Sequence, residues 1–129
     1  MGYTLKLDVG QRIVRVVFAS RCDNEEVTRA VTEARNAVSK DVVGIVYDMR
    51  DCEVGGMTLA DVFWLPRRNP AIAREAARHL RIAAIYPEHM EELMRFWETT
   101  SRNVGLKASA FADEHAALAW IAEGVQAAR

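Results

Sequence analysis

"LRIAAIYPEHMEELMRFW", residues 80–97, is the stretch that decides the fold. Its first seven residues are almost all apolar, which is typical of a strand that is covered on both faces of a sheet. Pro87 then opens a helix, because its fixed φ suits the first helical turn. Four apolar side chains follow at helical spacing and share one face of that helix: Met90, Leu93, Met94 and Trp97. The stretch therefore predicts a buried strand followed by an amphipathic helix.

Strands and helices alternate in the same way on both sides of this stretch. "VVGIVYDMR" (42–50) and "LKASAFA" (106–112) predict further apolar strands, and "YTLKLDV" (3–9) with "RIVRVVFAS" (12–20) predicts an N-terminal hairpin. Helical patterns cover residues 23–40, 58–65, 70–79, 87–105 and 113–124. This order favours parallel strands joined by right-handed crossovers. We therefore expect one α/β domain over residues 1–129, with a mostly parallel five-stranded sheet and an antiparallel N-terminal edge strand.

The element order and two short motifs resemble the SpoIIAA-like family of small STAS-related domains. In that family a strand of the type R-[IV]-A-[AV] is followed by a helix and another strand, and the last helix carries F-x-x-x-x-x-A-x-x-W-[IL]. The matching residues of this chain are Arg81, Ile82, Ala83 and Ala84, and then Phe111, Ala117, Trp120 and Ile121. The resemblance implies a (βα) superhelix in which consecutive strands are neighbours, and it implies a homodimer.

The turn before the second predicted helix is the candidate switch. In the wider STAS group, anti-sigma-factor antagonists carry a D-S-[ST]-G phosphoacceptor motif there, whereas this chain has "VGGMTLADV". We expect Thr58 to cap the helix together with Asp61, with phosphorylation of Thr58 as the alternative. Gly55 and Gly56 predict a tight turn, with a backbone nest for an anion as the alternative. Asp48, at the end of the predicted third strand, completes the candidate switch.

"MTLADVFWLPRRNP", residues 57–70, carries more apolar surface than one short helix needs for a core. We expect Leu59, Val62 and Phe63 on the core face. Trp64 and Leu65 are expected to carry the apolar surface from there toward solvent. Aromatic residues together with arginines are typical of interfaces. The predicted interface or ligand-binding residues are Met57, Phe63, Trp64, Leu65, Arg67 and Arg68. The alternative is a short helix buried beneath its neighbour.

Composition and charge set limits on the partners. The formal net charge is −1, so no overall positive field favours nucleic acid. No apolar run reaches the ~20 residues that span a bilayer, and the N-terminal residues do not resemble a signal peptide, so we expect a cytoplasmic protein without membrane insertion.

Cys22 and Cys52 are expected to be free thiols, since two thiols alone do not form a structural zinc site. We expect no metal and no cofactor.

The sequence pairs no nucleophile with a base, so an enzyme is not expected. The leading hypothesis is a non-enzymatic STAS-like regulatory or protein-interaction module that forms a homodimer. The alternative is a carrier or sensor that binds a small apolar or amphipathic molecule between the second helix and the sheet.

Overall fold

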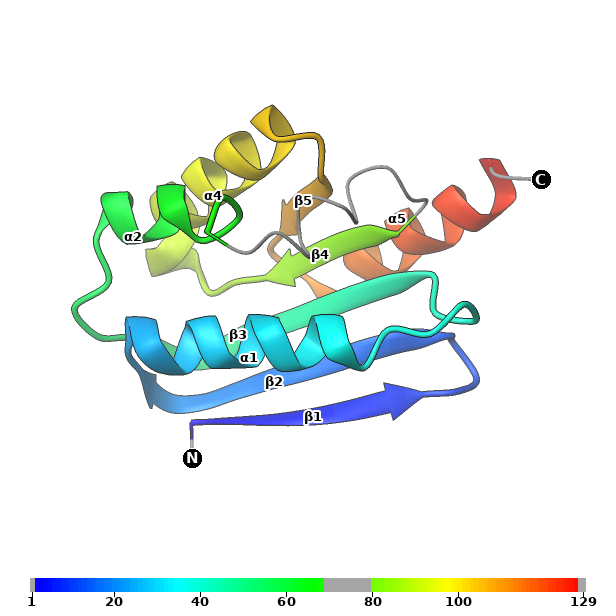
Figure 1. The fold of residues 1–129 in the computed structure, drawn as a ribbon, viewed down its shortest axis with the longest axis horizontal. Helices are drawn as coiled ribbons and strands as arrows, with labels where there is room; N and C mark the ends of the chain where they lie inside the picture. The colour runs from blue at the N-terminus through cyan, green and yellow to red at the C-terminus, as the bar shows by residue number, and fades with distance from the viewer. Residues whose placement is uncertain (1, 69–79, 128–129) are drawn as a thin grey trace.

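The computed structural model, which describes residues 2–68 and 80–127, contains a five-stranded sheet with helices on both faces (Figure 1). Its strands are β1 (Tyr3–Asp8), β2 (Ile13–Cys22), β3 (Gly44–Val54), β4 (Arg81–Ile85) and β5 (Lys107–Phe111). They lie in the sheet in the same order as in the chain. β1 is antiparallel to β2, and the other neighbouring pairs are parallel. The predicted α/β fold, with its antiparallel edge strand, is confirmed.

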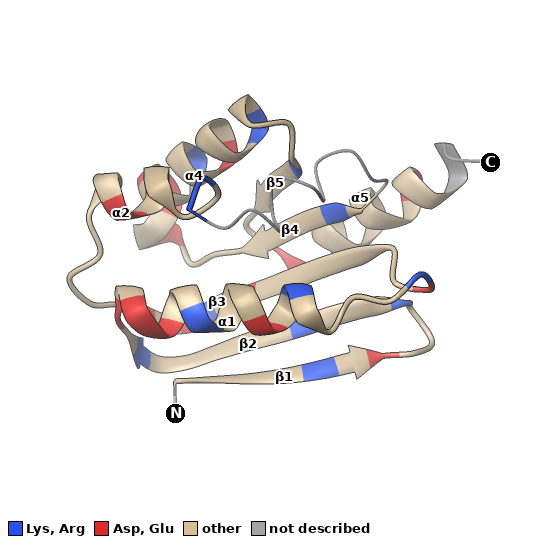
Figure 2. Cartoon of the chain, viewed as in Figure 1, with Lys and Arg blue, Asp and Glu red and all other residues tan. Residues whose placement is uncertain are grey.

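The helices follow the predicted order. They are α1 (Asn24–Asn36), α2 (Leu59–Trp64), the short 3₁₀ helix η1 (Glu88–Met90), α4 (Glu91–Asn103) and α5 (Glu114–Ala127). The helix that we expected at 70–79 lies outside the described residues. Asp23 caps α1 by accepting a hydrogen bond from the Glu26 amide at 2.8 Å, and acidic residues fill the first turn (Figure 2). The Asp23 cap pairs an amide that the start of a helix leaves free. The acidic side chains interact favourably with the positive end of the helix dipole.

The sheet separates two hydrophobic cores. α1, α2 and α4 cover one face, where Ile45, Tyr47 and Met49 of β3 point. α5 covers the other face, where Val46 packs against Ile121. This division follows from the alternation of side chains along a strand, and it explains why β3 is apolar on both sides.

β3 is longer than the predicted strand. We expected it to end at residue 50, with Asp48 at its carboxyl end, but it continues to Val54. The register with β2 shifts between Val17 and Ala19, and pairing then resumes and includes Cys22 opposite Val54. Such a bulge lets a strand continue past an irregular position. Asp48 therefore lies inside the strand, and its predicted position at the turn is wrong.

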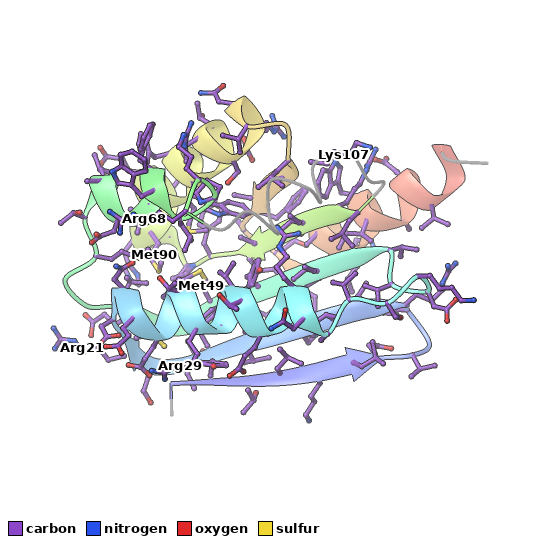
Figure 3. All side chains as sticks on the ribbon, in the orientation of Figure 1. Arg21, Arg29, Met49, Arg68, Met90 and Lys107 are labelled. Atoms are coloured by element: carbon purple, nitrogen blue, oxygen red, sulfur yellow. The ribbon has the colours of Figure 1, made fainter. Side chains whose placement is uncertain are left out.

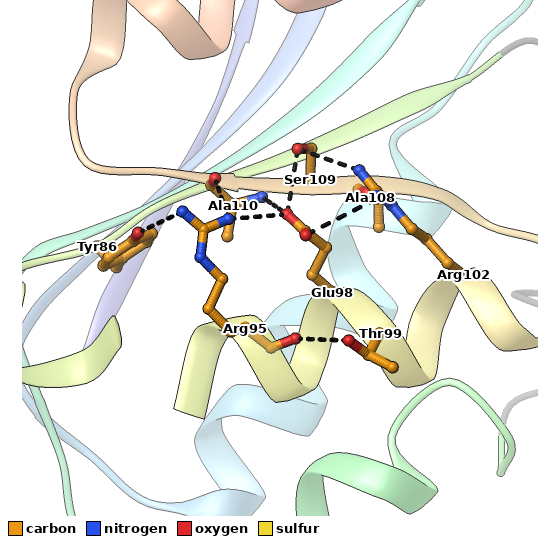
Figure 4. Close-up of polar contacts among 8 residues, drawn as sticks. All are labelled: Tyr86, Arg95, Glu98, Thr99, Arg102, Ala108, Ser109 and Ala110. Atoms are coloured by element: carbon orange, nitrogen blue, oxygen red, sulfur yellow. Dashed lines mark hydrogen bonds and ion pairs between the residues drawn. The ribbon is translucent and has the colours of Figure 1, made fainter. Parts of the chain in front are cut away.

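The free edge of β5 is occupied by side chains from α4 (Figure 4). The Glu98 carboxylate accepts a hydrogen bond from the Ala110 amide at 2.7 Å, and Arg102 Nε donates to the Ala108 carbonyl at 2.7 Å. Arg95 also donates to the Ala110 carbonyl, at 3.4 Å. Unpaired edge groups invite strand addition by another chain, so these contacts protect this edge.

Among residues 2–68 and 80–127, no helix is both long enough and apolar enough to cross a bilayer.

Candidate functional site

Thr58 begins α2 as a capping residue. Its hydroxyl accepts a hydrogen bond from the Asp61 amide at 3.2 Å, and the Asp61 carboxylate accepts one from the Thr58 amide at 3.0 Å. This reciprocal pair is a capping box, which satisfies two amides that a helix start leaves unpaired. The predicted capping role of Thr58 is confirmed.

Gly55 and Gly56 form the tight turn that leads into α2. Gly56 has a φ of 71°, a left-handed conformation that glycine adopts without strain. The Gly55 amide already donates to the Cys22 carbonyl at 2.9 Å, and the Arg21 side chain lies against the position that a Cβ of Gly55 would take. The turn is therefore tied to β2, and its Gly55 amide is not available to an anion.

The face of α2 that packs against the core is not the one that we predicted. Val62 is buried, and Leu65 packs against the same core just after the helix. Leu59 is 51% exposed, Phe63 37% and Trp64 45%. The prediction that Leu59 and Phe63 face the core is wrong, as is the prediction that Leu65 turns toward solvent. The outer face of α2 thus consists of Leu59, Phe63 and Trp64.

Arg67 and Arg68 lie against this outer face. The Arg67 guanidinium stacks over the Phe63 ring at 3.8 Å, donates to the Phe63 carbonyl at 2.7 Å and donates to the hydroxyl of Thr100 on α4. Arg68 lies over the Trp64 ring at 5.5 Å. Arg67 therefore fastens the C-terminal end of α2 to α4.

An apolar cavity of about 40 Å³ lies beneath α2, between this helix, α1, α4 and the sheet. We call it the α2 cavity. Every side chain that lines it is apolar or aromatic, among them Val31, Met49, Val62, Leu65, Met94 and Trp97. Met49 of β3, one of these lining residues, is labelled in Figure 3. Of the predicted interface or ligand residues, the structure brings Met57 and Leu65 to this cavity and places Phe63, Trp64, Arg67 and Arg68 outside it.

A smaller space of about 20 Å³ adjoins the α2 cavity and has polar groups in its wall. We call it the Arg35 pocket. It shares Val31, Tyr47, Leu65 and Trp97 with the α2 cavity, and it also contains Arg35 and Ser101. Arg35 is 8% exposed, Tyr47 6% and Ser101 1%. Among the described residues, no hydrogen-bond partner exists for Arg35 Nε and Nη1, the Tyr47 hydroxyl or the Ser101 hydroxyl.

The polar groups of the Arg35 pocket can act as hydrogen-bond donors. Burial raises the pKa of Tyr47, and the charge of Arg35 opposes this only in part. Tyr47 is therefore a neutral phenol with a proton to donate, beside the N–H groups of a guanidinium. Buried polar groups in proteins are almost always paired, so three side chains in one space without a partner among the described residues mark this space as a candidate binding site.

Arg35, Tyr47 and Ser101 are not among the site residues predicted from the sequence. One signal was present, because Arg35 follows Val31 by four residues and so continues the apolar face of α1. Ser101 follows Trp97 by four residues in the same way on α4. A charged or polar side chain on a core-facing stripe is the pattern that a search for buried polar groups would select.

Asp48 lies on the opposite face of the sheet from the α2 cavity. Arg50 Nη2 and Nε donate to its carboxylate at 2.7 and 3.0 Å, and Arg15 lies 3.8 Å away. Arg15 also pairs with Glu114, the first residue of α5. Burial alone would raise the pKa of Asp48, but the hydrogen bonds and charge of Arg50 outweigh it, so the pKa is lowered. Asp48 thus anchors α5 and is not part of the turn at Gly55, Gly56 and Thr58.

The two thiols lie close together in the first core, which is the one that α1, α2 and α4 cover. Cys22 and Cys52 are buried and free, and the Cys22 thiol donates to the Gly2 carbonyl at 3.0 Å. Burial, followed by the neighbouring Cys52, raises the pKa of Cys22 to about 12. A thiol with such a pKa is unreactive at neutral pH. No three of the described His, Cys, Asp and Glu residues gather closely enough to hold a metal ion.

A wider groove of about 340 Å³ runs along α5, on the other face of the sheet. Gln11, Arg12, Leu118 and Ile121 contribute to its walls. None of the unpartnered buried polar atoms of the described chain lies in this groove. The α2 cavity with the Arg35 pocket is therefore the better candidate site, although it is smaller.

Comparison with known proteins agrees with the fold. No protein-family model matches the chain, and neither does any curated protein. A solved structure that is similar belongs to an uncharacterized protein of the DUF3478 family, with a SpoIIAA-like fold, from Shewanella loihica PV-4. The TM-score is 0.59, the sequence identity is 14%, and the match covers 93% of each chain. At this identity the similarity establishes the fold alone, and the expected SpoIIAA-like fold is confirmed.

Proposed function

We propose that this SpoIIAA-like domain is a binding module rather than an enzyme, and that it carries or senses a small apolar or amphipathic molecule between α2 and the sheet. The observation that supports the proposal is the α2 cavity, whose wall is apolar throughout and contains side chains from three helices and the sheet. Ligand sites in proteins are concave and mostly apolar, with a few polar groups that orient the ligand.

The size of the cavity requires α2 to move when a ligand binds. A cavity of roughly 150 Å³ binds benzene, whereas the α2 cavity measures about 40 Å³. α2 has six residues and follows a turn at Gly56, and its outward movement breaks the hydrogen bond between Arg67 and Thr100 of α4. Short elements with few buried contacts open at lower free energy than the rest of a fold. In the bound state α2 therefore lies farther from the sheet, and the ligand replaces its contacts with the core.

Binding of octan-1-ol, measured by isothermal titration calorimetry, tests this proposal. The wild-type protein should bind octan-1-ol, and Val62→Ile should weaken binding several-fold because the added methylene enters the cavity. Val43→Ile is the matched control, since Val43 packs against the second core on the other face of the sheet. If the wild type does not bind, or if both variants bind like the wild type, the proposal fails.

The outer face of α2 supports a second candidate function, which is contact with a second copy of the chain. Leu59, Phe63 and Trp64 expose a continuous apolar and aromatic surface, and Arg68 lies over Trp64. Exposed surfaces of this composition are typical of interfaces. A STAS-like regulatory module would use such a contact to form a homodimer.

Sedimentation velocity tests the second candidate. Leu59→Ser with Trp64→Ala should shift a dimer to a monomer while the circular dichroism spectrum stays unchanged. Leu7→Ser is the control, because Leu7 is a comparably exposed leucine on β1 (53%, against 51% for Leu59). An unchanged sedimentation coefficient in the double variant excludes this surface as the dimer interface.

A further inference from the structure

We propose that the ligand of the α2 cavity is an amphipathic carboxylic acid, whose carboxylate binds in the Arg35 pocket while its apolar part fills the α2 cavity. This inference rests on the proposed function, because it names the chemical class of the molecule that binds beneath α2.

Arg35 is a buried cation that no described residue pairs. Its side chain is more than nine-tenths buried, and no described residue forms a salt bridge with it. A buried charge without a partner is strongly unfavourable, and the dipole at the C-terminal end of α1 offsets only part of that penalty. An anion in the pocket supplies the missing partner.

The Arg35 pocket contains several hydrogen-bond donors. Nε and Nη1 of Arg35 both lack a hydrogen-bond partner within residues 2–68 and 80–127. These two nitrogens donate from different edges of the guanidinium, and each can form a charge-assisted hydrogen bond with an anion. The hydroxyls of Tyr47 and Ser101, also without partners, belong to the same pocket. A carboxylate accepts hydrogen bonds without donating any, so each of these groups is a suitable donor to it.

A water molecule would fit the Arg35 pocket less well than a carboxylate. The Arg35 pocket measures about 20 Å³, and a site needs roughly 10–15 Å³ to hold one water. A water would pair some of the donors, but it would leave the positive charge of Arg35 uncompensated. A carboxylate provides the acceptors and the negative charge together.

The α2 cavity and the Arg35 pocket adjoin each other. Val31, Tyr47, Leu65 and Trp97 line both, so a molecule with its carboxylate at Arg35 continues directly into the α2 cavity. Leu65, at the end of α2, lines both spaces as well as packing on the core. An outward movement of α2 therefore opens the polar pocket and the apolar cavity at the same time. This geometry favours a ligand with one charged end.

The test compares octanoate with octan-1-ol, which have the same chain length and differ at the head group. At neutral pH, calorimetry should show that octanoate binds the wild-type protein at least tenfold more tightly than octan-1-ol. Arg35→Met should remove this preference and keep octan-1-ol binding, because methionine is apolar and unbranched. Tyr47→Phe and Ser101→Ala, which each remove one hydroxyl, should each reduce the preference several-fold.

The outcomes separate the two proposals. If the wild type binds both molecules equally, or if Arg35→Met binds octanoate like the wild type, the carboxylate assignment is overturned and the apolar site remains. If the wild type binds neither molecule, the proposed function fails as well. If Arg35→Met does not fold, Tyr47→Phe and Ser101→Ala decide, and an unchanged preference in both overturns the assignment.

Discussion

Replacing Arg35 by methionine should stabilise the ligand-free protein, although it removes a buried residue of the first core. The reason is that Arg35 is 8% exposed and two of its nitrogens have no hydrogen-bond partner among the described residues. Methionine keeps an unbranched apolar stem of similar length and has almost the same helix propensity, so α1 should form as before.

The size of the effect follows from the contacts that change. A buried polar group without a partner costs about 1–3 kcal/mol, and more when it is charged. Arg35→Met removes two such N–H groups. Against this, the variant loses a favourable interaction with the C-terminal helix dipole of about 0.3–1 kcal/mol. The free energy of unfolding should therefore rise by about 1–6 kcal/mol, which for a chain of this size raises Tm by several degrees or more.

Urea denaturation of protein that has been refolded from denaturant measures this effect without a retained ligand. The same experiment with excess octanoate should reverse the order, because octanoate stabilises the wild type by mass action and the variant much less. Arg35→Lys is the control, since it keeps the charge and should not gain stability. A loss of more than about 1 kcal/mol in ligand-free Arg35→Met would show that Arg35 is well paired within the fold, and the reasoning would be refuted.

Three further predictions concern the rest of the fold. Thr58→Ala should lower the free energy of unfolding by about 1 kcal/mol and Thr58→Ser should be nearly neutral in urea melts, and equal stability of all three proteins would contradict the capping role. Asp48→Asn should lower the urea midpoint at pH 7, where the ion pair with Arg50 is intact. Because the pKa of Asp48 is lowered by folding, its contribution is present above about pH 3.9 and is lost as the pH falls through the folded pKa, so the two midpoints should converge in acid. A midpoint difference that persists in strong acid would contradict this. Alkylation of denatured protein without reductant, followed by intact mass, should modify both Cys22 and Cys52, and a mass that lacks two adducts would indicate a disulfide.

The strand and helix order could be predicted because each element carries a strong local pattern. The apolar run before Pro87 and the spaced apolar residues after it leave little choice of structure, and the structure places β4 (Arg81–Ile85) and α4 (Glu91–Asn103) there. The capping box at Thr58 is equally local, because it needs only a hydroxyl and a carboxylate three residues apart.

The orientation of α2 could not be predicted in the same way. A helix of six residues has fewer than two turns, and two sets of apolar residues fit helical spacing: Leu59, Val62 and Phe63, or Val62 and Leu65. The sequence does not choose between them. The choice is made by the chain on either side, where Met57 packs on the core and Pro66 is buried, and these contacts turn Val62 and Leu65 inward.

The candidate site depends on contacts that are distant in sequence. Arg35, Tyr47 and Ser101 come from α1, β3 and α4, and no spacing rule connects them. The missing partners of these side chains are visible only once the helices are packed on the sheet. Asp48 shows the same limit, because its burial depends on Arg15 and Arg50 as much as on its own strand.

The central claim is that a ligand binds between α2 and the sheet, and ¹⁹F NMR of protein labelled with 5-fluorotryptophan tests it most directly. The chain has three tryptophans, of which Trp97 lines the α2 cavity, Trp64 lies on the outer face of α2, and Trp120 packs against the second core. Addition of octanoate should shift the Trp97 resonance in a saturable manner and leave Trp120 unchanged. A Trp97 resonance that stays in place at saturating octanoate, or a shift at Trp120 in its stead, would contradict the account.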